Sequence, residues 1–523
     1  MTSPQNSSNV DTPGPVLQPF SLLHPISQAA YVDNFESLLP TRRRAIQLWQ
    51  TFILNVDPMF KILHIPTVQP IVYAAINEPH DVKPDLRALL FAIYFSALTS
   101  TLRDVASCLN QDHEAELERF KRGIEISLSQ ADFLDQPTMQ ALQAMAIFIA
   151  AFRRFGSGRS IWTLNGMVIR AAQLMGIHRD GKLFNLSPFD QEMRHRLWWK
   201  IISTDSRTLE DQGMWTTGNR YLGDARLPLN IDDRDMSPQT TSMPQEHIGF
   251  AESTPLLSIC HIHIAGEAVA QLLLCADLES YSEKLPATQE AIDRTRAELE
   301  KKFFSNHNPH IPIQRLFSNL TKMILDKLEW QCQERLLRHK QNNGREDAKG
   351  EARNYDAESD ALFIRACELL DASLELVLDE IYTSYTWHTS SYPPYELLTF
   401  ILWRMYTSST QSSTDWAWQI VLRSFASIEE TSIIPDMGTR WSILCKLKEK
   451  VAGLRTHTQN NLQFVGSPDH SPPHAGLERE ARQENHDADV SLEGTTSDLE
   501  DPLFSMDWTT FQQSLNMDGM SWP

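Results

Sequence analysis

The chain has 523 residues, about three times the length of an ordinary single domain, and 41% of them are hydrophobic, so most of it can build a core. Its formal net charge is 47 − 67 = −20, and duplex nucleic acid is bound by concentrated lysine and arginine, so the charge balance excludes the chain as a whole as a duplex binder. With only 20 glycines, the composition favours helices over turn-rich β architectures.

The first 38 residues predict a disordered leader, because they are rich in serine, proline and asparagine. Residues 1–19 have neither the basic start nor the apolar run of a secretory signal. We see no stretch of about 18 apolar residues in the chain, so we expect no membrane span. The six cysteines are scattered, which predicts reduced thiols in an intracellular protein. They are Cys108, Cys260, Cys275, Cys332, Cys367 and Cys445.

Residues 39–457 predict an all-α body. Its first helix should begin after the N-cap Thr41, because Trp49 and Phe52 recur at helical spacing, and it should stop at Asp57-Pro58. Apolar residues at the same spacing predict later helices over 85–110, 139–154, 161–175, 189–210, 261–280, 288–304, 312–338, 357–381, 395–407 and 440–454.

One segment nearly matches a phosphate-binding loop. It runs from Gly176 to Leu183 and contains Lys182, but Leu183 stands where the loop needs a hydroxyl to hold magnesium. A helix rather than a strand precedes it. We therefore interpret Gly176 as the end of a helix.

Two other groups resemble metal ligands. Cys260 and His263 would share a helix face, with His261 between them, but no fourth ligand at zinc spacing completes the set, so we interpret them as core residues. The acidic run 232–235 is interpreted as a turn in a loop. The strong enzymatic motifs are also absent from the sequence. We expect no enzyme and no catalytic, cofactor-binding or metal site.

The densest basic run is 42–44. It could serve as a nuclear import signal or a phosphate contact, but three charges followed by the apolar Trp49 and Phe52 favour a solvated helix start.

Several segments in order resemble one family, the fungal-specific transcription factor domain, which is the all-helical middle region of zinc binuclear cluster regulators. The segments are 52–67, 167–181, 192–199 and 227–230. Residues 212–214 depart from the family's turn. The residues that carry the resemblance are His64, Pro66, His178, Arg179, Asp180, Arg194, Arg196, Trp198 and Trp199. We expect structural roles for them, with Arg194 and Arg196 pairing with acids such as Asp205 or Asp180.

The family's zinc cluster needs six cysteines within about 30 residues, interleaved with basic residues. Here no cysteine precedes Cys108 and no lysine or arginine precedes Arg42. We therefore expect no DNA reading by the chain unaided. It would reach DNA indirectly through a partner, or an exon encoding the cluster is missing from the gene model.

Residues 458–523 predict a disordered acidic tail, with 11 acidic and two basic residues from 471 onward. Within it, 502–517 is predicted to form an activation helix. Its bulky face comprises Phe504, Trp508, Phe511 and Leu515. Such a segment is typical of activation regions that fold onto a coactivator, although a C-terminal helix docked on its own domain would show the same pattern.

The resemblance implies a nuclear, pathway-specific transcriptional regulator, for example of a secondary-metabolite gene cluster. Its expected partners are a coactivator or transcription machinery and a homo- or heterodimeric DNA-binding regulator, with no cofactor and no membrane. The alternative is a helical small-molecule sensor or enzyme without transcription activity.

Overall fold

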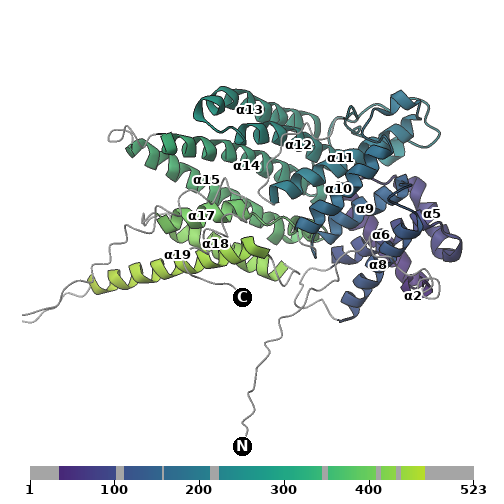
Figure 1. The fold of residues 1–523 in the computed structure, drawn as a ribbon, viewed down its shortest axis with the longest axis horizontal. Helices are drawn as coiled ribbons and strands as arrows, with labels where there is room; N and C mark the ends of the chain where they lie inside the picture. The colour runs from purple at the N-terminus through teal and green to yellow at the C-terminus, as the bar shows by residue number, and fades with distance from the viewer. Residues whose placement is uncertain are drawn as a thin grey trace, which may run out of the picture. The chain divides into compact units, whose positions relative to one another are not determined.

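A computed structural model describes residues 35–101, 111–155, 158–211, 223–343, 352–407, 414–431 and 438–465 (Figure 1). These residues form helices and turns, and none of them lies in a β-strand, which confirms the predicted all-α class. The chain divides into two compact units. The first comprises Met1–Ile401 and Gln411–Met437, and the second comprises Leu402–Thr410 and Gly438–Pro523.

An N-terminal group of helices packs around α6. Its members are α2 (Phe35–Leu38), α3 (Arg42–Thr51), α4 (Asp57–Phe60), α5 (Ile65–Asn77), α6 (Pro84–Thr101), α8 (Gln111–Gln130) and α9 (Met139–Phe152). Every residue of α6 from Ala88 to Ser100 is buried, because α3, α8 and α9 cover it on different sides. A helix that is apolar all round can be stable in water only in such a position.

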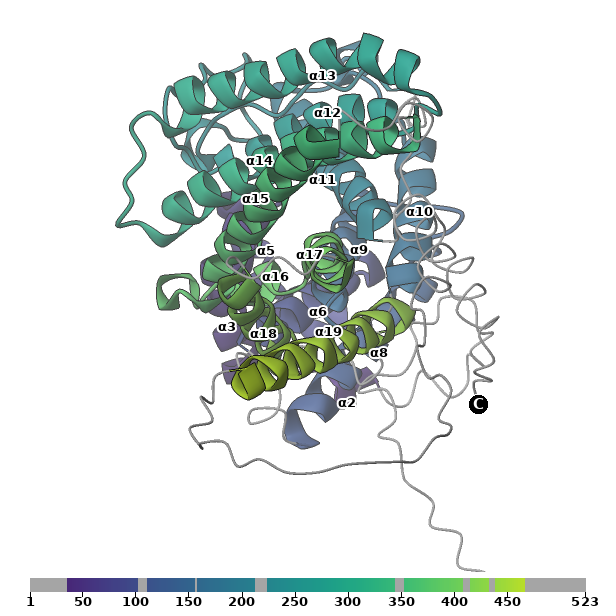
Figure 2. The same cartoon turned by 90° about the vertical axis from the view of Figure 1, so that its left-hand side faces the viewer.

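A second group of helices in the first unit follows. Its members are α10 (Gly158–Leu174), α11 (Pro188–Asp211), α12 (Thr254–Leu273), α13 (Leu278–Leu299), α14 (Pro312–Asn343), α15 (Ala352–Leu378), α16 (Thr386–Thr389) and α18 (Thr414–Thr431). Helices α12, α13 and α14 pack on one another, and α11 joins them to α9 and α10 (Figure 2).

The last helices involve both units. Helix α17 (Tyr395–Thr407) begins in the first unit and ends in the second, which also contains α19 (Gly438–Val465). Within the second unit, Lys450 Nζ lies 5.8 Å from the centre of the Tyr406 ring. The predicted helix at 440–454 is present, and it continues through residue 457, where we expected the body to end.

The start of the first helix matches the prediction, but its end does not. Thr41 Oγ1 accepts a hydrogen bond from the Arg44 amide at 3.3 Å, as an N-cap should. The Asp57-Pro58 step does not stop the chain's helical path, because Pro58 lies in the first turn of α4, where a missing amide hydrogen is tolerated. The path ends at Lys61, whose φ of 46° is left-handed.

Gly176 ends α10 as predicted. Its φ is 69°, and its amide donates to the Gln173 carbonyl while the Ile177 amide donates to the Ala172 carbonyl, both at 3.0 Å. This pair of bonds is the Schellman motif, which favours glycine because the residue after the helix is left-handed.

Helix α12 changes one expectation. Among the described residues it is the one helix that is long and apolar enough to cross a membrane, although we expected none. Core helices of soluble proteins reach the same length and apolarity. Here half of the apolar window of α12 is buried, and the helix packs against α11, α13 and α14. One such helix is weak evidence for a membrane span.

Candidate functional site

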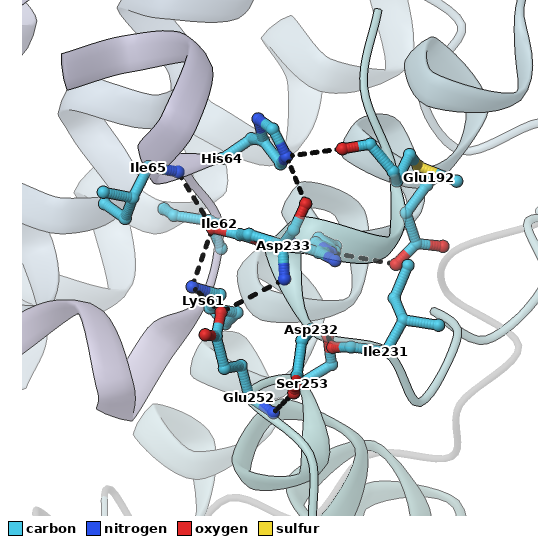
Figure 3. A network of polar contacts seen from close by, with 12 residues as sticks. Lys61, Ile62, His64, Ile65, Glu192, Ile231, Asp232, Asp233, Glu252 and Ser253 are labelled. Atoms are coloured by element: carbon cyan, nitrogen blue, oxygen red, sulfur yellow. Dashed lines mark hydrogen bonds and ion pairs between the residues drawn. The ribbon is translucent and has the colours of Figure 1, made fainter. Parts of the chain in front are cut away.

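A buried ion-pair network lies where α4 ends. Lys61 Nζ lies 2.8 Å from Asp233 and 2.7 Å from Glu252 (Figure 3). It also lies 3.1 Å from Asp57, one turn earlier in the chain. The left-handed turn at Lys61 ends the helical path where the loop containing Asp233 meets it. An N-terminal helix is thereby joined to a loop that follows α11 by more than 20 residues.

Asp233 connects this lysine to α11. Its Oδ1 accepts from Arg196 Nη1 at 2.9 Å, and its Oδ2 accepts from the Ile65 amide at 2.9 Å. Arg196 Nε also donates to Glu192 one turn earlier, at 2.9 Å. Arg196 is 1% exposed, so its charge is compensated almost entirely by these two carboxylates.

His64 fixes the same loop through its backbone. Its Nε2 lies 2.8 Å from the Asp233 carbonyl and 3.0 Å from the Met236 carbonyl, and carbonyl oxygens only accept, so Nε2 carries the proton. Its Nδ1 then accepts from the Thr67 amide at 3.3 Å and caps α5, in which Pro66 occupies the first turn. The neighbours therefore select the neutral Nε2–H tautomer.

The network contains more acid than base. Two cations, Lys61 and Arg196, face four carboxylates: Asp57, Glu192, Asp233 and Glu252. Burial and the neighbouring acids raise the pKa of Asp57 to about 6 against the opposing charge of Lys61. Burial alone would raise the pKa of Asp233, but Lys61 and Arg196 lower it below its ordinary value. Burial also raises the pKa of Glu192 above its ordinary value, so the buried acids of the network differ in how readily they take up a proton.

A second, more exposed junction contains the His178-Arg179-Asp180 motif. Arg179 donates to both carboxylate oxygens of Asp224, at 3.0 and 3.2 Å, and Asp180 pairs with Arg226 at 3.1 Å. The His178 carbonyl accepts from the Asp224 amide at 3.1 Å. The hydrogen bonds from Arg179 lower the pKa of Asp224.

The partners expected for the motif arginines are wrong. Arg196 binds Glu192 and Asp233, and Arg194 Nη1 donates to the Met175 carbonyl at 3.3 Å. Asp205 instead accepts from Asn165, at 3.4 Å, and Asp180 binds Arg226. Sequence spacing could not reveal these partners, because they depend on how the loop after residue 223 folds back.

The two motif tryptophans of α11 have different surroundings. Trp198 is 4% exposed and belongs to the core, with its ring centre 5.8 Å from that of His178. Trp199 is partly buried and donates from Nε1 to the Arg226 carbonyl at 2.8 Å. Both therefore anchor α11 to the junction around Arg226.

The acidic run 232–235 is more than a loop turn. Its central carboxylate, Asp233, is the hub described above, and the sequence interpretation missed it. Among the described residues, Asp232, Asp235 and His247 have ligand atoms within 4.8 Å of one another, a spacing that could hold a metal ion. Asp235 Oδ2 already lies 2.6 Å from His247 Nε2, and Asp232 accepts from the Glu252 amide at 2.9 Å.

The side chains of Cys260, His261 and His263 do not converge on one point, because each has different neighbours. His263 Nδ1 lies 2.8 Å from Ser206 Oγ, while His261 Nδ1 lies 3.7 Å from Glu298. Cys260 is fully buried, and burial raises the pKa of its thiol. These contacts are those of core residues with polar neighbours, as interpreted from the sequence.

The basic run 42–44 makes structural contacts. Arg42 donates to the Asn77 carbonyl at 3.2 Å, and Arg44 pairs with Glu116 at 2.8 Å. These bonds hold α3 against neighbouring helices. The predicted activation helix, with Phe504, Trp508, Phe511 and Leu515, lies outside the described residues.

A cavity of about 200 Å³ lies beside α11 in the first unit. Its lining comes from Met59 of α4, from α11, α12, α14 and α15, and from the segment 388–397, and most of its exposed surface is apolar. One lining residue, Lys200, belongs to α11 directly after the two motif tryptophans. Its side chain is buried, and its Nζ lies 4.1 Å from the centre of the Phe60 ring.

Lys200 has no ionic or hydrogen-bonding partner for its amine among the described residues. Burial lowers the pKa of this amine to about 7, and the nearby charge of Arg153 contributes to the decrease. A sequence signal for Lys200 did exist: it lies three residues after Leu197 and seven after Met193, on the apolar face of the helix.

A carboxylate that lines the same cavity already has cationic partners other than Lys200. Glu210 also lines the cavity, and it binds both Arg207 and Lys327. Burial alone would raise the pKa of Glu210, but these two cations lower it to about 2. Glu210 therefore stays ionised and compensates Arg207 and Lys327 rather than Lys200.

A larger hollow, of about 570 Å³, lies between α11 and the loop around residue 247. Several of its charged groups are paired within the chain, because Glu192 binds Arg196, Glu298 binds Lys302 and His247 binds Asp235.

The first unit is an all-helical body whose distant segments are joined by buried ion pairs and which borders a mainly apolar cavity. Residues 49–307 match the family model of the fungal specific transcription factor domain. The resemblance that we drew from the sequence is confirmed. All residues of the buried network, from Asp57 to Glu252, lie within the matched region.

The chain is similar to several curated transcription factors. It is 29% identical over 394 residues to the aurofusarin cluster transcription factor of Gibberella zeae, covering 73% of this chain and 56% of the relative. It is 35% identical over 221 residues to a pyriculol/pyriculariol biosynthesis cluster transcription factor of Pyricularia oryzae, covering 42% and 30%. A C6 finger domain transcription factor of Aspergillus fumigatus is 28% identical over 352 residues, covering 57% and 45%. The chain thus spans about half the length of these relatives or less.

Proposed function

We propose that this protein is a nuclear transcriptional regulator of a specific pathway, such as a secondary-metabolite biosynthetic gene cluster. The main support is the fungal specific transcription factor domain at residues 49–307. Two relatives are named as transcription factors of the aurofusarin and pyriculol clusters, which supports a pathway-specific role. The relatives are named as transcription factors rather than enzymes, which favours regulation over catalysis.

We further propose that the helical body regulates and that the acidic tail activates. The tail's bulky residues at 504, 508, 511 and 515 would share one face of a helix, and surrounding acids would steer that face to a basic-rimmed groove on a coactivator. The six-cysteine zinc pattern does not occur in these 523 residues. A homo- or heterodimeric partner, or a segment outside the present sequence, would supply the contact with DNA.

A reporter assay tests the activation. The full chain is fused to a heterologous DNA-binding domain, and transcription of a reporter is measured in fungal nuclei. We expect activation, and we expect a variant with alanine at Phe504, Trp508 and Phe511 to lose most of it. The matched control has alanine at Leu503 and Met506, which lie off the predicted face, and it should retain activity.

Two outcomes contradict the proposal. One is a fusion that enters nuclei and leaves the reporter silent. The other is an equal loss in the control and the test variant, which shows that overall apolarity rather than one helix face is responsible.

A further inference from the structure

The cavity beside α11 combines an apolar wall with one unmatched cationic residue. Apolar groups of Met59, Ile262, Phe317 and Leu397 line it, and the amine of Lys200 borders it. A lysine is seldom fully buried without a partner, because its charge loses hydration that nothing replaces. The Lys200 amine therefore lacks an anionic partner among the described residues.

The groups around Lys200 add to the positive potential. Arg153 and Arg207 stack on the ring of Tyr392, which also lines the cavity, with guanidinium carbons 4.2 and 4.9 Å from the ring centre. Arg153, directly after α9, and Cys260 of α12 act on the Lys200 amine. The other charged or titratable groups of the cavity are Arg207 and Glu210 of α11, His263 and Glu267 of α12, Lys327 of α14 and His388 of α16. Burial and the three cations hold the pKa of His388 well below its ordinary value, so it is neutral.

We propose that this cavity binds a small, mainly apolar molecule that carries one acidic group, and that the anion of that group pairs with Lys200 Nζ. The binding itself stands on the geometry of the cavity. The interpretation of the bound molecule as an effector of gene regulation rests on the proposed function above.

The size of the cavity sets the size of the ligand. An engineered apolar cavity of about 150 Å³ is known to bind benzene, so about 200 Å³ accommodates a somewhat larger skeleton, of one to two fused rings. Such a ligand buries apolar surface against the wall, and its carboxylate or phenolate gains a charge-assisted bond to a desolvated amine.

Gly266 of α12 is a second observation that points to open space at this cavity. It borders the cavity, and no heavy atom lies within 4 Å of the position that a Cβ would occupy. Glycine within a helix costs about 1 kcal/mol relative to alanine. A Cβ at this position would meet open space, so the glycine leaves room beside the cavity that the fold itself does not require.

The test compares two isosteric probes on the purified full-length chain. Isothermal titration calorimetry measures the affinity of 2-naphthoate, an anion, and of 2-naphthamide, its neutral counterpart. We expect the anion to bind more tightly. In Lys200→Met we expect naphthoate to bind about tenfold more weakly or worse, with naphthamide nearly unchanged, because only the charged bond is removed. Lys322→Met, at an exposed lysine of α14, is the matched control and should bind both probes normally.

A cavity-filling variant locates the binding. Gly266→Leu should weaken both probes, since its side chain occupies the site, and circular dichroism should show an unchanged helical fold. Lys200→Met should also fold, because it replaces a buried charge by an apolar group of similar length.

Three results overturn the proposal: neither probe binds at its solubility limit, both bind wild type equally, or Gly266→Leu binds naphthoate as wild type does. Any of these leaves the reporter assay, and with it the transcriptional proposal, unaffected. A silent reporter in turn leaves the binding result standing.

Discussion

The substitution Asp233→Asn tests whether the buried network holds the domain together. Asparagine keeps the shape of the side chain and can still accept from the Ile65 amide. It removes the charge that Lys61 and Arg196 share at 2.8 and 2.9 Å. Both cations remain buried, at 4% and 1% exposure, so water cannot compensate for the lost carboxylate.

The expected loss of unfolding free energy depends on which carboxylates Lys61 and Arg196 retain in the variant. Removing one partner from a buried ion pair typically costs about 3–5 kcal/mol. Here Lys61 retains Asp57 and Glu252, and Arg196 retains Glu192, so we expect about 3 kcal/mol, the lower end of that range. For a unit of this size, this corresponds to a decrease of about 4 °C in the midpoint of thermal unfolding.

Differential scanning calorimetry of the full chain measures this shift. The matched control is Asp232→Asn, because Asp232 is the neighbouring carboxylate and its ion-pair partner Arg234 is largely exposed. The control should move the midpoint by less than about 1 °C. Equal shifts for the two variants, or no shift for Asp233→Asn, would refute the argument that the charge of Asp233 is what joins α4 to α11.

Three further predictions concern the cavity and its surroundings. The affinity for 2-naphthoate should fall about tenfold between about pH 6 and about pH 8, because Lys200 in the unliganded protein loses its proton around pH 7. Calorimetry in buffers of matched ionic strength measures this affinity, and an affinity that does not change with pH contradicts the prediction. Burial lowers the pKa of His263 from 6.5 to about 4, so the neutral side chain stabilises the fold fully above about pH 6.5, and this stabilisation is lost as the pH falls toward 4. In His263→Gln, the free energy of unfolding should therefore decrease by up to about 3 kcal/mol less than in wild type over this range. Unfolding free energies of the variant and wild type that run parallel across this range would rule this out. Gly266→Ala should stabilise the unfolding transition by about 1 kcal/mol, and a destabilised variant would show that the space beside Gly266 is occupied.

Helices were predictable wherever one apolar face repeated. The stripe through Trp49 and Phe52 indicated α3, and Gly176 indicated the end of α10. Helix α5 was missed because prolines at 66 and 70 obscure its start and interior, although proline in the first turn is compatible with a helix. The predicted stop at Asp57-Pro58 was wrong for the same reason.

The buried network could not be predicted from local pattern. Asp233 lies in a run of acids that reads as an exposed turn, and its partners Lys61 and Arg196 are far away in the sequence. Only folding of the loop after residue 223 brings the three together. The family resemblance drew attention to His64 and Arg196, both of which contact Asp233 or its backbone in the structure. The partners that we expected for Arg196 from charge alone were wrong, because the sequence does not show which residues are close in space.

The separation of Lys61 from Glu252 has a consequence for biosynthesis. A ribosome adds about 5–20 residues per second, so the 252 − 61 = 191 residues between them take about 10 to 40 s to emerge. Throughout that interval the nascent N-terminal helices carry a lysine whose set of native counter-charges is incomplete, because Asp57 is present but Glu252 has not yet been made. Messages truncated before codon 233 would encode products in which Lys61 has Asp57 alone, and such products are natural clients for chaperones and proteases.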